Sequence, residues 1–141
     1  MGKSSRAVWQ GNFIEGKGQL NIENSELNKV TIKPFFAKSD GSFTNPEELL
    51  AAAHAGCFTM ALSLVLGESK LKADSLDTTC TITIEKDGEG FSITRSHLEL
   101  KAKVPGASQE VFDNAVQAAK TNCPVSKLFD TEITLSAKLE H

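Results

Sequence analysis

One stretch of the sequence constrains the fold more than any other: residues 49–67 include no formally charged side chain. Before it stand Asn45, a favoured helix N-cap, and Pro46, which suits the first helical position. Glu48, three residues after Asn45, completes the pattern of a capping box. The sequence therefore predicts one long, almost wholly apolar helix that begins at Pro46 and stops at Gly67.

Apolar residues recur along this stretch at helical spacing, as expected of a helix: Leu50, Ala53, Cys57, Met60, Ala61 and Leu64. The run is close to the roughly 20 residues that span a bilayer. Polar residues such as His54 and Ser63 dilute its apolarity, however, and no positively charged flanks frame it. We therefore expect a core helix and no membrane span. A helix that is apolar on nearly all sides needs cover on nearly all sides, which a partner subunit would complete.

Length and composition favour a single cytoplasmic domain over residues 1–141. With 40% hydrophobic and 23% charged residues, the 141-residue chain suffices for one core and has no composition break. A net charge of -3 argues against a general nucleic-acid or acidic-membrane binder. The N-terminus lacks the apolar region of a secretory signal, and three cysteines do not make a secreted disulfide scaffold. Residues 139–141 resemble the stub of a purification-tag linker, so His141 is given no functional weight.

Strand patterns surround the long helix. Residues 7–10, 12–14, 19–22 and 30–36 resemble short strands, the last broken at Pro34, and residues 78–85, 91–104 and 133–139 alternate as longer ones. Asp87-Gly88 marks a hairpin, and the inward parity of the return strand changes, which predicts a bulge between Arg95 and His97. A second helix, Gln109–Asn122, is capped by Ser108. This order predicts an α+β fold with antiparallel sheets around the central helix.

Two of the three cysteines have contrasting surroundings. Cys80 is predicted on the same strand face as Ile82 and Ile84, where a free cysteine behaves as a small hydrophobe. Cys57 is flanked on its helix by alanines and Gly56, which leave room for a molecule to approach the sulfur. Burial alone is nevertheless more typical of an inert core thiol, so composition leaves both interpretations of Cys57 open.

The third cysteine, Cys123, follows the second predicted helix. Pro124 is predicted to open a further helical turn over residues 125–129. Cys123 would then be an N-cap, where backbone N–H groups stabilise a thiolate. An inert Cys123 is equally compatible with the sequence.

Other chemistries have weaker support. No close metal-ligand spacing occurs, although His54 and Cys57, three residues apart, are placed to reach one ion; a satisfied helix histidine is the simpler interpretation. The sequence has no phosphate loop, no dinucleotide fingerprint and no GxSxG element. Aromatic residues are few and are not interleaved with a basic stripe, as single-strand nucleic-acid binding would need. We expect no metal, no cofactor and no nucleic-acid partner.

Two long motifs resemble the OsmC/Ohr family, the osmotically inducible protein C and organic hydroperoxide resistance proteins of bacteria. The first is TNPEEL running into AHAGCF, around Cys57, and the second is NCPVS, which begins at Asn122. The resemblance extends to WQG at Trp9, GKG at Gly16 and VPG at Val104, and so covers essentially the whole chain. The forms AAHAGCF and NCPVS resemble the OsmC branch more than the Ohr branch.

This resemblance implies a peroxiredoxin-like thiol peroxidase that reduces organic hydroperoxides, and less well hydrogen peroxide, in oxidative and osmotic stress defence. It implies an intertwined homodimer with sites at the subunit interface. By motif position, Cys57 is the peroxidatic cysteine, Cys123 the resolving cysteine and Glu47 the carboxylate of the site. A dithiol, in this family a lipoylated protein, would reduce the Cys57–Cys123 disulfide.

The peroxidatic role places a physical demand on the surroundings of Cys57. This residue lies about three helical turns from the helix N-terminus, beyond the reach of the macrodipole, and burial raises a thiol pKa. A cation must therefore come close. Glu47 is about 15 Å away along a straight helix, so we expect it to orient that cation across a kink near Gly56 or from a partner subunit.

The family arginine expected upstream of the helix is missing from this chain, whose two arginines are Arg6 and Arg95. Lys38 is the candidate replacement, although lysine is a point charge without the planar fork of arginine, and a solvated loop lysine is the alternative. If no cation replaces the arginine, we expect weak catalysis. The alternative function is then a dimeric protein that binds a hydrophobic ligand in its interface pocket.

Overall fold

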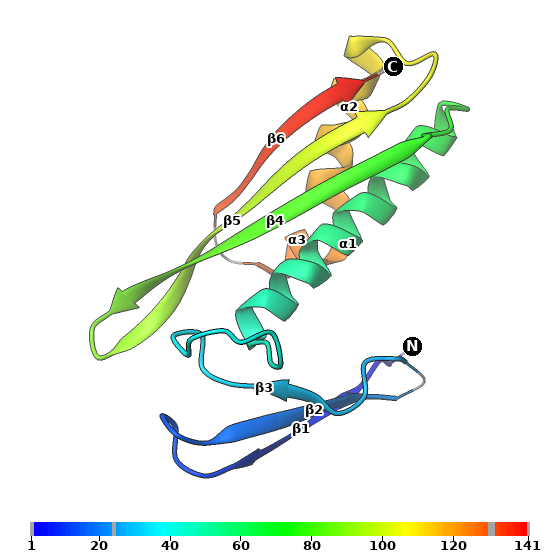
Figure 1. Cartoon of the computed structure of the whole chain (residues 1–141). Helices are drawn as coiled ribbons and strands as arrows, with labels where there is room; N and C mark the ends of the chain where they lie inside the picture. Colours follow the sequence, from blue (N-terminus) through cyan, green and yellow to red (C-terminus); the bar gives the residue numbers. More distant parts are fainter. Residues whose placement is uncertain (1, 24, 130–131, 141) are drawn as a thin grey trace. The chain divides into compact units, whose positions relative to one another are not determined.

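The computed structural model describes residues 2–23, 25–129 and 132–140, so the prediction about His141 lies outside the described residues. The chain forms two compact units, Met1–Leu49 and Leu50–His141 (Figure 1). The first is a small sheet with a long loop, and the second holds most of the long first helix, two further helices and a larger sheet. The predicted α+β class is confirmed.

The sheet of the N-terminal unit is antiparallel, in the order β1 (Ser5–Gln10), β2 (Lys17–Ile22) and β3 (Val30–Ile32). Trp9 lies opposite Gly18 in this sheet. A Cβ added at Gly18 would lie 2.7 Å from Cε3 of Trp9 and 2.8 Å from Cγ1 of Ile32. A glycine is therefore needed at this position so that the indole and Ile32 can pack over the strand. Trp9 of the WQG motif and Gly18 of the GKG motif thus have a structural role.

Two predicted strand segments of this unit are wrong. Residues 12–14 form a turn, because the Asn12 side chain accepts the N–H of Glu15 at 2.7 Å and its carbonyl accepts the N–H of Gly16 at 2.9 Å. Residues 33–36 also leave the sheet, since β3 ends at Ile32. The chain returns beside β3 at Thr44, whose carbonyl accepts the N–H of Lys33 at 3.0 Å.

Helix α1 (Pro46–Glu68) begins as predicted. The Asn45 side chain accepts the N–H of Glu48 at 2.8 Å, and its own amide donates to the Glu48 carboxylate at 2.6 Å. The two side chains thus bond to each other and also cap the first turn of the helix. The helix continues without interruption across Gly56, where a kink was one of the two predicted alternatives.

The helix ends at Glu68, one residue beyond the predicted stop at Gly67, in a Schellman motif. The N–H of Leu71 bonds to the carbonyl of Leu66 at 2.9 Å, and the N–H of Lys70 to that of Gly67 at 2.9 Å. Lys70 takes the left-handed conformation with φ 58°. Leu66 is buried in the core and Leu71 packs against it, and the motif forms here without a glycine at the left-handed position.

The series of apolar residues at helical spacing does not mark the buried face of α1. The buried face of α1 is made instead by His54, Phe58, Leu62 and Leu66, whereas Met60 and Leu64 are 75% and 68% exposed. A helix that is apolar on nearly every side fits several stripes equally well, so periodicity could not choose between them. By length and composition α1 is apolar enough to cross a membrane, but its buried stripe packs as a core helix does.

The C-terminal unit contains a three-stranded sheet in the order β4 (Ser75–Asp87), β5 (Gly90–Lys103) and β6 (Glu132–Glu140). The hairpin predicted at Asp87-Gly88 joins β4 and β5, which are antiparallel. Strand β6 is parallel to β5, unlike the antiparallel arrangement predicted. The reason is the crossover through α2 (Gln109–Asn122) and α3 (Pro124–Leu128), which carries the chain back so that β6 begins beside Arg95 of β5 and runs in the same direction.

The predicted bulge is present but displaced. The register shifts where Thr83 faces Arg95 while Ile84 faces Ile93, so the extra residue is Thr94 and does not lie between Arg95 and His97. After the bulge the even-numbered residues of β5 turn inward, beginning with Ser96, which is fully buried. The bulge therefore determines that Ser96 faces the core.

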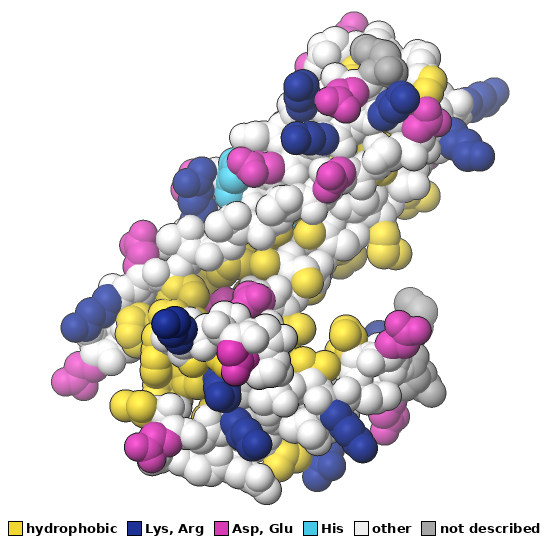
Figure 2. Space-filling model, in the orientation of Figure 1, with side chains coloured by type: hydrophobic (Ala, Val, Ile, Leu, Met, Phe, Trp, Pro, Cys, Tyr) yellow, Lys and Arg dark blue, Asp and Glu magenta, His cyan; other side chains and the backbone are white. Residues whose placement is uncertain are grey.

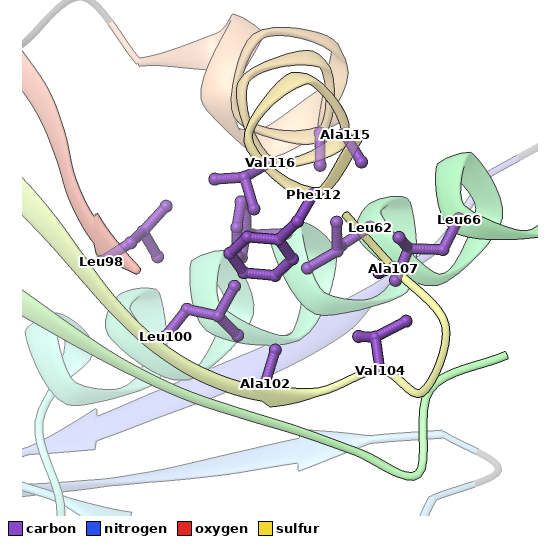
Figure 3. Packing of buried hydrophobic residues seen from close by; sticks show 12 residues of the cluster. Leu62, Leu66, Leu98, Leu100, Ala102, Val104, Ala107, Phe112, Ala115 and Val116 are labelled. Atoms are coloured by element: carbon purple, nitrogen blue, oxygen red, sulfur yellow. The ribbon is translucent and has the colours of Figure 1, made fainter. Parts of the chain in front are cut away.

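The core of this unit lies between α1, α2 and one face of the sheet. In Figure 3 the ring of Phe112 from α2 lies among Leu62 of α1 and Leu98 and Leu100 of β5. Because the inward residues of β5 contact both helices, α1 and α2 cover the same face. Hydrophobic side chains also remain at the surface of both units (Figure 2), among them Phe13, Ile14, Phe36, Met60, Leu64 and Leu128.

Candidate active site

The thiols of Cys57 and Cys123 lie in contact inside the C-terminal unit. Cys57 is half-buried on α1, and Cys123 is fully buried at the junction of α2 and α3. Burial raises the pKa of the Cys57 thiol above its ordinary value, the hydrogen bond that it donates to the Cys123 thiol raises the pKa further, and the N–H of Val125 lowers it. The fold thus brings together the two cysteines that the motifs singled out.

Helix α3 begins at this pair of sulfurs. Cys123 is its N-cap and Pro124 its first residue, as predicted, but the Cys123 side chain makes no capping hydrogen bond. The N–H of Val125, in the first turn of α3, donates to the Cys57 sulfur instead. The backbone N–H at the start of α3 therefore bonds to the Cys57 sulfur and not to the Cys123 sulfur. The prediction had given this N–H to Cys123, the residue that caps the helix.

A buried histidine lies one helical turn before Cys57. His54 is fully buried, its Nδ1 lies 2.6 Å from Oγ of Ser96 on β5, and its Nε2 lies 2.9 Å from Oγ of Ser126 on α3. The ring also packs edge-on against Phe129, with 4.9 Å between the centroids. Burial lowers the pKa of the imidazole, so His54 is neutral at pH 7. Both ring nitrogens are engaged, which confirms the satisfied helix histidine and leaves no nitrogen for the metal ion considered with Cys57.

Cys80 packs at the edge of this polar cluster. Its sulfur lies 3.3 Å from Oγ of Ser96 and 3.8 Å from Nδ1 of His54, and the side chain rests against the hydrophobic core. Burial raises the pKa of the Cys80 thiol, and the Ser96 hydroxyl opposes that shift. The predicted core role of Cys80 is confirmed.

Glu47 and Lys38 lie in the N-terminal unit. One carboxylate oxygen of Glu47 is buried and has no hydrogen-bond partner among the residues that the structure describes. Lys38 is exposed in the loop between β3 and α1 and forms no ion pair with Glu47 in the described part of this unit. Their predicted roles toward Cys57 therefore stay predictions.

The N-terminal unit also contains an apolar groove with a volume of about 460 Å³. The groove is lined mainly by apolar side chains, from Trp9, Gly11, Phe13, Ile32, Lys33, Pro34 and Pro46. The ammonium group of Lys33 lies 4.5 Å from the centre of the Phe43 ring, a cation–π contact. The groove suits an alkyl or aryl group.

Sequence reasoning missed the partners that surround the sulfurs. The hydroxyls of Ser96 and Ser126 and the N–H of Val125 belong to elements far from α1 in the sequence, and the one local signal was that Ser126 belongs to the NCPVS motif. Among the described residues, no group of three or more histidine, cysteine or carboxylate side chains is placed to hold a metal ion.

The family model described as OsmC-like protein matches residues 39–138. The chain is 42% identical to Peroxiredoxin OsmC of Escherichia coli over 98% of this chain and 96% of that protein. It is 32% identical to Organic hydroperoxide resistance protein-like 1 of Staphylococcus epidermidis, over 88% and 87% of the two chains. The crystal structure of an OsmC-like protein from Mycoplasma pneumoniae shares the fold, with a TM-score of 0.79, 14% identity and coverage of 100% and 99%.

These relatives, together with the α+β fold and the two thiols in contact, define the class of the protein. It is a peroxide-related redox protein and an enzyme of the peroxidase type. The chain belongs to the OsmC family.

Proposed function

We propose that this protein is a thiol peroxidase that reduces organic hydroperoxides to alcohols, and hydrogen peroxide less well. The observation that carries the proposal is the contact between the Cys57 and Cys123 thiols, because a peroxidatic cysteine needs a second thiol within reach. Cys57 is the half-buried member of the pair, and Cys123 is fully buried. A peroxide therefore meets Cys57 first, which supports Cys57 as the peroxidatic and Cys123 as the resolving cysteine.

The proposed cycle balances for two thiols and one peroxide. The Cys57 sulfur attacks the O–O bond of ROOH, so that the alcohol ROH leaves and Cys57 becomes a sulfenic acid. The Cys123 thiol then attacks this sulfur, a disulfide forms and one water leaves. An external dithiol, proposed to be a lipoylated protein, reduces the disulfide by exchange and is itself oxidised to a disulfide.

The remaining need is a positive charge for the Cys57 thiolate. Burial and the Cys123 hydrogen bond both disfavour the thiolate, and the single N–H of Val125 opposes them. We assign the cation to Lys38, which is exposed and unpaired with Glu47 in the described part of the N-terminal unit, and its orientation to Glu47. The carboxylate oxygen of Glu47 that is buried without a partner supports this assignment, because such a group needs a donor.

A homodimer is part of the proposal. Met60 and Leu64 leave an apolar face of α1 exposed, and all six residues of β1 are exposed. Single exposed apolar residues are ordinary, but a row on one helix marks an interaction site. A second copy of the chain carries the same surfaces and would bury both.

The apolar groove of the N-terminal unit favours one alternative function, the binding of a hydrophobic ligand without turnover. The two functions differ in their need for sulfur. Ligand binding by this groove is indifferent to Cys57, whereas peroxide reduction depends on it.

The test is hydroperoxide consumption with dithiothreitol as reductant. Cumene hydroperoxide should be consumed faster than hydrogen peroxide by the wild type, and not at all above background by Cys57→Ser. Cys123→Ser should consume one equivalent and then become overoxidised at Cys57. Cys80→Ser, which changes the third thiol, is the matched control and should keep turnover. A wild type that binds a fluorescent apolar probe yet consumes no hydroperoxide would establish the alternative.

A further inference from the structure

The buried side chain of His54 connects the sheet to the short helix that carries the second sulfur. It is on α1, one turn from Cys57, and its two nitrogens bond to different elements: Ser96 on β5 and Ser126 on α3. His54 and Ser96 are fully buried and Ser126 is 7% exposed, so water does not replace either bond. A buried imidazole with both nitrogens engaged fixes the distance between those two elements.

Helix α3 depends on this connection because it is short. It has five residues, and its first turn supplies both the Cys123 sulfur and the Val125 N–H to Cys57. Ser126 follows Val125 directly, and the helical bond from the Lys127 N–H to the Cys123 carbonyl, 3.1 Å long, joins the same turn. A shift of Ser126 therefore moves the Cys123 sulfur as well.

We infer that His54 is a positioning residue for Cys123: its hydrogen bond to Ser126 holds α3 so that the Cys123 sulfur meets Cys57, and it thereby controls how fast the disulfide forms. The inference rests on the proposed function for the step that it accelerates. In that step Cys123 attacks the oxidised Cys57 sulfur, and water leaves if Cys57 is a sulfenic acid. The reaction of Cys57 with peroxide precedes it and does not need α3 to be tied to His54.

The two bonds of His54 provide matched variants. Ser126→Ala removes the bond to α3, and Ser96→Ala removes the bond to the sheet, so both take one hydroxyl from the same imidazole. His54→Asn places its amide near Nδ1 and keeps reach to Ser96, whereas His54→Gln places its amide near Nε2 and keeps reach to Ser126. Ser126→Thr restores the hydroxyl.

The experiment follows the intact mass of the reduced protein over time after one equivalent of cumene hydroperoxide or, in a second arm, of diamide. Diamide oxidises thiols without peroxidase chemistry: Cys57 adds to its N=N bond, and Cys123 displaces the hydrazine to leave the disulfide. Ser126→Ala and His54→Asn should form the disulfide about tenfold more slowly in both arms, while the sulfenic acid or diamide adduct accumulates. Ser96→Ala, His54→Gln and Ser126→Thr should stay within about threefold of the wild type.

The two arms separate the inference from the proposed function. A wild type that forms the disulfide with diamide but not with peroxide ends the peroxidase proposal, and the slow variants in the diamide arm still support the role of His54. Equal rates in all five variants overturn the inference, and so does equal slowing by Ser96→Ala and Ser126→Ala, since that shows general core damage. Because the inference requires the fold to survive loss of this bond, unfolding of both Ser126→Ala and His54→Asn at 25 °C also overturns it.

Discussion

The thiol of Cys57 donates a hydrogen bond to the thiol of Cys123, and this bond raises the pKa of the cysteine that is proposed to react first. The contact that makes a disulfide possible thus opposes the formation of the thiolate. Only the Val125 N–H, among the influences that the described residues exert on Cys57, acts in the other direction. The pair is therefore well placed to resolve a sulfenic acid and poorly ionised to form one.

The Lys38→Gln variant should ionise Cys57 at higher pH than the wild type. If Lys38 is the missing cation, its loss leaves only the Val125 N–H to oppose burial and the Cys123 hydrogen bond, and the apparent pKa of Cys57 should rise by about one unit. The rate of Cys57 alkylation by iodoacetamide between pH 6 and 11, followed by peptide mass, measures it. Lys33→Gln, which removes a charge from the same unit, is the control and should leave the profile in place. Identical profiles for wild type and Lys38→Gln would show that another group serves Cys57.

Stability should fall in mild acid because of His54. Its pKa is lowered in the folded state, so below about pH 6.5 the unfolded chain takes up a proton that the folded chain refuses. This contribution is complete above the unfolded pKa and is lost as the pH falls towards the folded one, by up to about 1.4 kcal/mol per pH unit. Urea unfolding at pH 7.5, 6.0 and 5.0 tests this. His54→Gln should flatten the dependence, and an equally steep dependence in that variant would refute the assignment.

The end of α1 offers a gain in stability. Lys70 is held at φ 58°, a conformation that favours glycine, because Leu71 is drawn into the core. Lys70→Gly should therefore raise the free energy of unfolding by about 0.5–1 kcal/mol. Lys72→Gly removes the same exposed side chain two residues later, where φ is not positive, and should bring no gain. Equal effects of the two substitutions in urea unfolding would mean that backbone strain at Lys70 is not the cause.

The proposed dimer depends on the exposed face of α1. Leu64→Glu places a charge on that face and should shift the protein from twice the chain mass of 15.2 kDa towards one chain in light scattering coupled to size exclusion. Gln117→Glu adds the same charge to the exposed side of α2 and should leave the dimer intact. A wild type that elutes as a single chain at 100 µM would contradict the dimer itself.

Local chemistry made parts of the fold predictable. The cap of α1 depends on Asn45 and Glu48, three residues apart, and both side chains bond as their spacing indicates. The hairpin at Asp87-Gly88 and the start of α3 at Pro124 were equally local. The sequence did indicate a bulge, because the inward-facing residues of β5 change from odd to even numbers. The pattern of outward and inward residues does not, however, locate the extra residue at Thr94.

Features that depend on tertiary contacts could not be predicted. The sequence of α1 is apolar on so many sides that it does not indicate that His54 faces the core while Met60 faces outward. Nor does it indicate that Ser96 and Ser126 meet at one imidazole, because nothing local links a strand, a helix and a second helix. The contact of Cys57 with Cys123 was implied by family resemblance, and the residues alone had left both thiols ambiguous.

The most direct test of the central claim is the intact mass of the reduced protein after one equivalent of cumene hydroperoxide, followed by peptide mapping. The contact between Cys57 and Cys123 predicts a loss of about 2 Da and a single disulfide that links these two cysteines, with Cys80 still free. An unchanged mass, a gain of oxygen that persists on Cys57, or a disulfide to Cys80 would contradict it.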